Sequence, residues 1–169
     1  MDALTLLKTQ VRGLRRDWNS VMGDMTQEQL LWRPPGIANP IVSLVMHVVG
    51  GQDNVVNVTA QGKQKVWDAN NWGEKLKVSP VGRQDLEAGR NLHVDIDGFK
   101  EYADEVFASV DAYLAQAQLD DLDREVQGFG GNMVPLGNML SGMLVTHFMG
   151  HLGEVSALKG CQGGKGWAG

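Results

Sequence analysis

The chain has 169 residues, of which 43% are apolar and 21% are charged. These are ordinary values for a globular protein of one domain, so we expect a single domain over residues 1–169 rather than a disordered chain. The 20 acidic and 15 basic residues give a net charge of −5, which argues against a nucleic-acid partner because such binders normally carry a basic face or tail.

Neither a membrane span nor an export signal is expected. The longest apolar run, residues 41–49, contains Ser43 and His47 and is too short to cross a bilayer. The N-terminal segment carries Asp2 and places its basic residues after the apolar ones, the reverse of the order in a signal peptide. Cys161 is the single cysteine, so no internal disulfide is possible. We therefore expect a cytoplasmic protein with no membrane partner.

Apolar residues at alternating three- and four-residue steps predict a long N-terminal helix. Its apolar seam, which Asp2 can cap, consists of Leu4, Leu7, Val11, Leu14, Trp18, Val21 and Met25. A short helix is expected next, because Thr26 and Gln29 have the spacing of a capping box. The sequence Arg33-Pro34-Pro35-Gly36 then ends that helix.

A second long helix is predicted over about residues 40–60. Asn39-Pro40 combines a capping residue with a proline at the first helical position. Gly50-Gly51 in the middle of this helix allows either a kink or the close approach of a neighbouring element.

The helical pattern is lost over residues 62–95. A connection of this length in a compact domain is often functional. Trp67 and Trp72 lie in it and can wall a pocket, pack between subunits, or anchor the connection to the helices. We expect the anchoring role.

Two further long helices are predicted near residues 97–118 and 136–158. The seam of the last helix reads Leu136, Leu140, Met143, Leu144, His147, His151, Glu154 and Leu158. Four long amphipathic helices without a convincing strand predict an all-α fold, a four-helix bundle.

Histidine is the residue type that points to chemistry, because three of the four histidines lie on these apolar seams. His147 and His151 are four residues apart on one helix face, so their rings can point at one ion at Zn–N distances of about 2.0–2.1 Å. His47 lies mid-helix, where an unpaired polar ring would be costly to bury. The pattern favours a metal site with three protein ligands and an open position. The alternative is three core histidines that donate hydrogen bonds to carbonyls.

Four passages spread over nearly the whole chain resemble the motifs of one family. They are Asp17-Trp18, Leu30-Leu31-Trp32-Arg33-Pro34-Pro35, Ser43-Leu44-Val45-Met46-His47, and His147-Phe148-Met149-Gly150-His151-Leu152-Gly153-Glu154. The last resembles the H-x-x-x-H-x-G-[QE] ending of the DinB/YfiT-like family of metal-dependent bundle proteins. The resemblance implies an up-down-down-up four-helix bundle with its long connection between helices two and three. It also implies a divalent ion held by His47, His147 and His151, and a homodimer.

Family members with assigned activities include thiol-cofactor-dependent transferases and a maleylpyruvate isomerase. We therefore expect a metal-dependent enzyme in which the ion activates a thiol or a water for transfer, isomerisation or hydrolysis of a small-molecule substrate. Zinc or nickel is the first expectation, although iron and manganese also suit three imidazoles, and a low-molecular-weight thiol is a candidate cofactor. The alternative is a non-catalytic dimeric bundle with a structural or vestigial metal site. A structural zinc site usually has four protein ligands, so the open position favours the enzyme.

Several polar residues near the histidines are further candidates. Glu154 can orient a ligand histidine or act as a catalytic general base, or it can form a salt bridge at an exposed bundle end. Arg33 can bind an acidic substrate or a thiol cofactor, or it can cap helix carbonyls. The run Gln52-Asp53-Asn54 lies one to two turns past His47 and can supply a partner of a ligand histidine or a water contact. Asp53 lies on a different helix face from His47, so we expect it on the solvated surface. His93 is also expected in solvent.

Overall fold

The computed structural model describes residues 1–78 and 86–166. Helix α1 spans Ala3–Met22 and is capped by Asp2, whose carboxylate accepts a hydrogen bond from the Thr5 amide at 2.8 Å. All seven residues of the predicted seam are buried. Helix α2 spans Gln27–Leu31 and begins with the predicted capping box between Thr26 and Gln29. The predictions for the first two helices are therefore confirmed.

Helix α3 spans Ile41–Asp53 and continues into η1, a π-helical segment over Asn54–Ala60. The N-cap is Pro40, in an extended conformation and without a side-chain cap. The prediction that Asn39 caps this helix is wrong, because the extended ψ angle of 159° at Pro40 moves the first helical residue to Ile41. The remaining extent of the predicted helix agrees with the structure.

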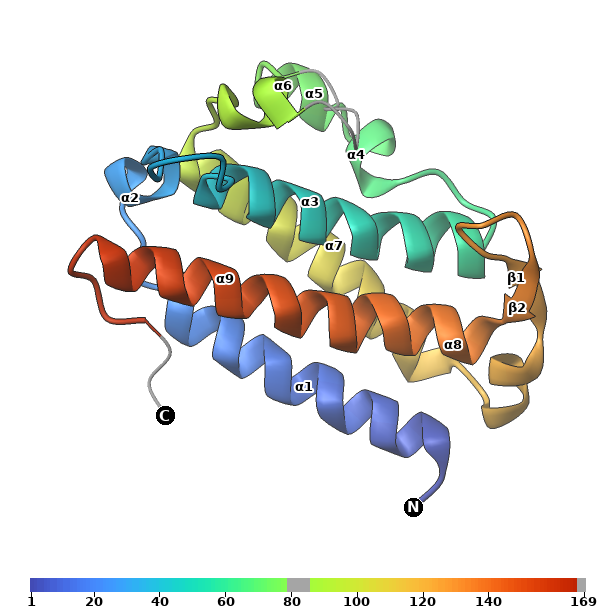
Figure 1. Cartoon of the computed structure of the whole chain (residues 1–169). Coiled ribbons are helices and arrows are strands. Elements are labelled where there is room, and N and C mark those ends of the chain that lie inside the picture. Colours follow the sequence, from blue (N-terminus) through green and yellow to red (C-terminus); the bar gives the residue numbers. More distant parts are fainter. Residues whose placement is uncertain (79–85, 167–169) are drawn as a thin grey trace.

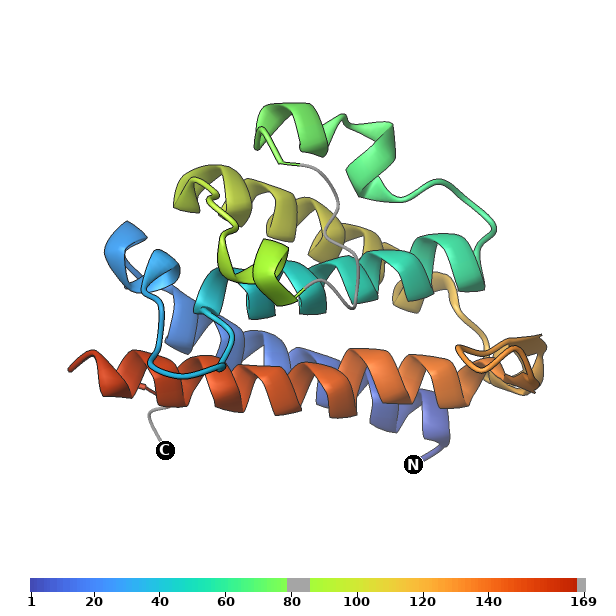
Figure 2. The same ribbon diagram turned by 45° about the horizontal axis from the view of Figure 1, so that its top comes forward.

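The long connection forms three short helices, α4 (Val66–Ala69), α5 (Trp72–Lys75) and α6 (Leu86–Arg90), which lie over α3 and the next long helix, α7 (Figure 2). Trp72 is 2% exposed, and its Nε1 donates a hydrogen bond to Glu105 at 2.7 Å. The Trp67 and Trp72 rings both pack against the ring of Tyr102. The anchoring role expected for the two tryptophans is thus confirmed.

Asp53 is buried at 0% exposure, so the prediction that it lies on the solvated surface is wrong. Its carboxylate accepts hydrogen bonds from the backbone amides of Val66 at 2.8 Å and Trp67 at 3.0 Å. Asn57 Nδ2 at 2.9 Å and the Tyr102 hydroxyl at 3.3 Å donate to the same carboxylate. The connection folds back over this face of α3 and covers it. Burial and the nearby Asp53 charge raise the pKa of Tyr102 well above its usual range.

Helix α7 spans Ile96–Gln116, and a 3₁₀ segment, η2 (Leu119–Asp123), follows it. Strands β1 (Glu125–Gln127) and β2 (Met133–Pro135) then form a small antiparallel hairpin that the sequence did not predict. The last long segment joins α8 (Leu136–Ser141), the π-helical η3 (Gly142–His147) and α9 (Phe148–Cys161) without a break.

The long helical segments lie side by side around one core (Figure 1). Helix α3 packs against α7 and α9, and α1 packs against α9. At the centre, the Trp18 ring stacks on Phe148 with centroids 5.4 Å apart and meets Phe107 edge-on at 5.4 Å. The prediction of an all-α chain is confirmed apart from the hairpin. Within residues 1–78 and 86–166, no helix combines the length and apolar character that crossing a bilayer requires.

A buried lysine joins the ends of α1 and α9. Lys159 is 1% exposed, and its Nζ donates to the Val21 carbonyl at 2.7 Å and to the carboxylate of Asp24. The last carbonyls of a helix lack partners within the helix, so Lys159 satisfies one of them. The hydrogen bond and charge of Lys159 hold the pKa of Asp24 below its ordinary value.

The four hydrogen bonds that the Asp53 carboxylate accepts predict a large loss of stability on Asp53→Ala. Each buried donor left without an acceptor costs about 1–3 kcal/mol, so we expect the free energy of unfolding to fall by at least about 2 kcal/mol. Urea denaturation measures this change, with Asp123→Ala at an exposed position as the control. Equal stability of the two variants would contradict the role assigned to Asp53.

The Asp24–Lys159 pair predicts a pH-dependent effect of Asp24→Asn. A carboxylate with a depressed folded-state pKa stabilises the fold above its unfolded pKa, near 3.8, and this contribution is lost as the pH falls through the folded value. The wild type should therefore exceed the variant in stability at pH 7, and the difference should vanish as the pH falls below about 4. Denaturation at several pH values in this range measures the difference in stability, and Asp120→Asn at an exposed position is the control. A difference independent of pH would contradict the ion pair.

Candidate metal centre

Three histidines from two long helical segments come together on one side of the molecule. His47 lies in α3, His147 ends η3, and His151 lies one turn later in α9. The Nε2 atoms of His47 and His147 are 3.0 Å apart, and one ring nitrogen from each histidine lies within 4.8 Å of the others. The three ring centroids are separated by 4.9, 5.2 and 4.6 Å. The structure therefore brings together all three predicted ligands.

The spacing of these nitrogens suits a shared divalent ion. Two imidazole nitrogens that each lie about 2.0–2.1 Å from one ion are about 2.8–3.4 Å apart when the angle between them is about 90–110°. The 3.0 Å between His47 and His147 agrees with this separation. Three neutral imidazoles are a donor set that zinc, nickel, iron and manganese all accept. The residues present therefore fit a bound metal.

Gly51 lets the two histidine-bearing segments approach each other. It lies one turn after His47 in α3, and a Cβ atom at this position would be 2.6 Å from Met143 Cε and 3.6 Å from His147 Cε1. A Cβ here would displace the flexible end of Met143 and would make ordinary van der Waals contact with the His147 ring, so η3 lies close against α3 at this glycine. Of the two roles predicted for the glycine pair, the structure confirms close approach.

The π-helical segment η3 ends at His147, where the wider turn returns to the α-helical geometry of α9. π-Helical turns have i→i+5 hydrogen bonds and often occur at functional sites. His147 thus lies at the junction between the two geometries, and His151 follows within regular α-helix. No pattern in the sequence distinguishes η3 from the α-helix around it.

The three-histidine group is open to solvent on one side. His47 is exposed, whereas His147 and His151 are partly buried. The His151 side chain is 23% exposed and that of Glu154 is 57% exposed. A closed structural site would bury its ligands, so this exposure leaves room for a water or a substrate beside an ion.

Glu154 contacts the group through His151. The distance between Glu154 Oε2 and His151 Nδ1 is 2.8 Å. A carboxylate that accepts the Nδ1 proton fixes the ring orientation and leaves Nε2 as the atom that can bind a metal. The structure therefore places Glu154 where it can orient a ligand histidine, one of the roles considered from sequence.

Arg33 lies in the loop between α2 and α3. Its Nη1 donates to Asn91 Oδ1 at 3.0 Å. The neighbouring Arg90 donates to the carbonyls of Pro34 and Ala38. These bonds tie the loop after α2 to the end of the long connection. The roles of Arg33 in ligand binding and helix capping stay predictions.

The long connection reaches the edge of the histidine group. Ser43, one turn before His47, donates its hydroxyl hydrogen bond to the Gly89 carbonyl in α6. The connection therefore borders the site at the N-terminal end of α3. His93 is exposed and lies outside the group, as expected.

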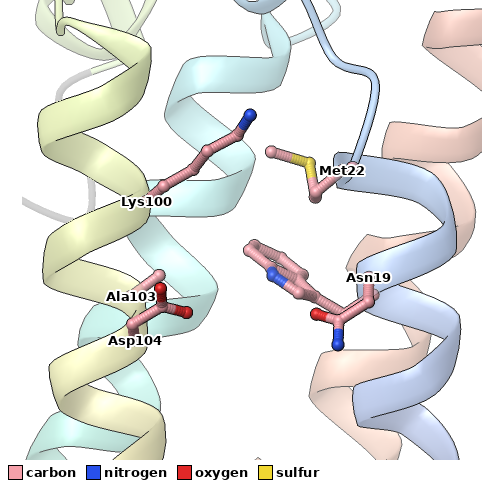
Figure 3. Close-up of a pocket in the computed structure, with 7 residues that line it drawn as sticks. Asn19, Met22, Lys100, Ala103 and Asp104 are labelled. Atoms are coloured by element: carbon pink, nitrogen blue, oxygen red, sulfur yellow. The ribbon is translucent and has the colours of Figure 1, made fainter.

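A surface pocket of about 250 Å³ lies elsewhere, between α1 and α7 (Figure 3). Its walls are formed by Trp18, Asn19, Met22, Gly23, Lys100, Ala103 and Asp104. None of the three histidines lines this pocket, so it is separate from the candidate metal centre.

Comparisons with known proteins agree with the fold. A family model described as the DinB superfamily matches residues 10–155. A crystal structure of a conserved protein from Enterococcus faecalis matches with a TM-score of 0.80 and 16% identity, covering 94% of this chain and 96% of that chain. At this identity, the similarity to the solved structure shows the fold alone. No curated protein matches the chain.

The contact with Glu154 predicts a selective effect on metal affinity. Glu154→Ala should weaken zinc binding about 10–100-fold, because His151 loses the acceptor that orients its ring. Glu154→Gln keeps an acceptor oxygen and should bind zinc almost as tightly as the wild type. Competition with a chromogenic chelator measures both affinities, and Glu101→Ala on the exposed face of α7 is the control. Unchanged affinity in Glu154→Ala would show that Glu154 does not support the site.

Proposed function

Because the chain belongs to the DinB superfamily, we propose that it is a metal-dependent enzyme whose ion is held by His47, His147 and His151. The observation that carries the proposal is the meeting of three imidazole nitrogens within 4.8 Å of one another. Three protein ligands leave a coordination position open, which is typical of catalytic rather than structural zinc sites.

The reaction that we propose is the activation of a thiol or a water by the ion. A divalent ion bound to neutral ligands supplies a Lewis acid that lowers the pKa of a water or thiol at the open position. Zinc or nickel is the ion that we favour, and iron or manganese suits the same ligands. A thiol-dependent transfer, an isomerisation or a hydrolysis of a small molecule would each use this chemistry.

Glu154 has two tasks in this proposal. Its 2.8 Å contact with His151 Nδ1 supports a role in holding that ring with Nε2 toward the ion. Its 57% exposure leaves the carboxylate accessible to a substrate, which supports a second role as the general base. The glutamine variant separates these roles, since an amide can orient the ring but cannot take up a proton.

Arg33 is the residue that we propose for recognition of an acidic substrate or a low-molecular-weight thiol cofactor. It is exposed, and its guanidinium carries a planar set of donors that suits a carboxylate. Its bond to Asn91 lies where the long connection meets the loop before α3. Substrate binding by Arg33 would use this same junction.

The competing function is a non-catalytic dimeric bundle with a structural or vestigial metal site. The exposure of His47 and Glu154 favours the enzyme, because a structural ion is normally enclosed by four protein ligands. We also propose that residues 1–169 form one cytoplasmic domain with the up-down-down-up helix order of the family. We further propose that two copies of the chain form a homodimer.

The metal site predicts that His147→Ala or His151→Ala removes most bound metal while the helices remain folded. His93→Ala is a matched control, because His93 is the exposed histidine outside the group. Elemental analysis of untagged protein purified without chelator should give about one transition-metal equivalent per chain for the wild type and for the His93 variant. Circular dichroism at room temperature measures folding of each variant.

Two results would overturn this proposal. The first is a wild type that binds no metal and shows no thermal shift with zinc, nickel or manganese. The second is loss of helical signal in the His147 or His151 variant, which would make the site structural rather than functional.

A further inference from the structure

Gln52 is a buried polar residue of α3 that the fold does not satisfy. It is 2% exposed, and across residues 1–78 and 86–166 its Oε1 has no hydrogen-bond partner. The next residue, Asp53, is equally buried but accepts several hydrogen bonds. Buried acceptors normally have a donor, and one without a donor reduces stability. Packing alone therefore does not explain why a polar side chain occupies this buried position.

Gln52 directly follows the residue of α3 that lies against His147. The residue before it, Gly51, lies against this histidine, since a Cβ at Gly51 would be 3.9 Å from His147 Nδ1. The Nε2 atom of the same ring faces His47 at 3.0 Å. The ring thus directs Nε2 toward the other histidines and its Nδ1 side toward the backbone of α3. Gln52 carries its oxygen four bonds beyond its own Cα, which is enough to reach a ring that contacts the adjacent residue.

We propose that Gln52 is the positioning residue of His147, and that its Oε1 accepts a hydrogen bond from the Nδ1–H of this ring when an ion is bound at Nε2. This inference rests on the proposed function, because it needs His147 to be a ligand. A histidine that binds metal through Nε2 carries its proton on Nδ1 and commonly donates it to an oxygen that fixes the ring. Glu154 supplies such an oxygen to His151 from the exposed side, and Gln52 supplies one to His147 from the core.

The proposal explains why a polar side chain is retained at a core position. A methionine has a similar length and no acceptor oxygen to bury, so packing alone would favour it. A glutamine at this position lowers the stability of the metal-free protein, and it raises the metal affinity because its oxygen gains a donor when the ion binds. Stability and metal affinity should therefore respond in opposite directions to its replacement.

The experiment compares Gln52→Met with the wild type in two measurements. Urea denaturation of the metal-free proteins should give the variant an equal or higher midpoint, because the unsatisfied oxygen is gone. Competition with a chelator should show zinc binding weakened about 10–100-fold. Gln52→Glu keeps an acceptor oxygen and should recover most of the affinity. Gln116→Met, at an exposed position of α7, controls for the change of residue type.

The outcomes separate this inference from the proposed function. Gln52→Met that binds zinc as tightly as the wild type overturns the inference while leaving the three-histidine site intact. A lower urea midpoint for the metal-free variant also overturns it, since Gln52 would then have a structural partner. A wild type that binds no zinc overturns the proposed function and the inference with it.

Discussion

The packing of α3 against η3 and α9, with a close contact at Gly51, brings together the three histidines of the candidate metal centre. With no side chain there, the ring of His147 lies against the backbone of α3, and a Cβ would come within 2.6 Å of Met143. His47, one turn earlier, then meets His147 with their Nε2 atoms 3.0 Å apart. A Cβ at position 51 would require the flexible end of Met143 to shift, and it would lie in van der Waals contact with the His147 ring. The spacing of the histidines is therefore a property of helix packing rather than of either helix alone.

Gly51, Gln52 and Asp53 are consecutive in α3, and each has a different environment. Gly51 lies against η3, and Gln52 is buried with an Oε1 that has no hydrogen-bond partner within residues 1–78 and 86–166. Asp53 turns the other way and holds the start of α4 through two backbone amides. The candidate metal centre and the long connection thus both lie against this turn of α3.

Much of this arrangement could be predicted from the sequence, because helix faces follow from a 3.6-residue period. That period placed His47, His147 and His151 on apolar seams, and the pair Gly50-Gly51 indicated either a kink or the close approach of a neighbour. It failed at Asp53, whose partners are the amides of a segment without periodicity, so no local pattern reports its burial. The π-helical geometry of η3 and the buried Lys159 were also missed, since both depend on packing between distant segments.

The central claim is that three of the four histidines bind one ion through ring nitrogens, and imidazole ¹⁵N NMR tests it most directly. With four histidines in the chain, each ring can be assigned and its protonated nitrogen identified. One equivalent of zinc should shift the Nε2 signals of His47, His147 and His151 together and leave His93 unchanged. Shifts confined to one or two of these rings, or an equal response from His93, would contradict a shared three-histidine site.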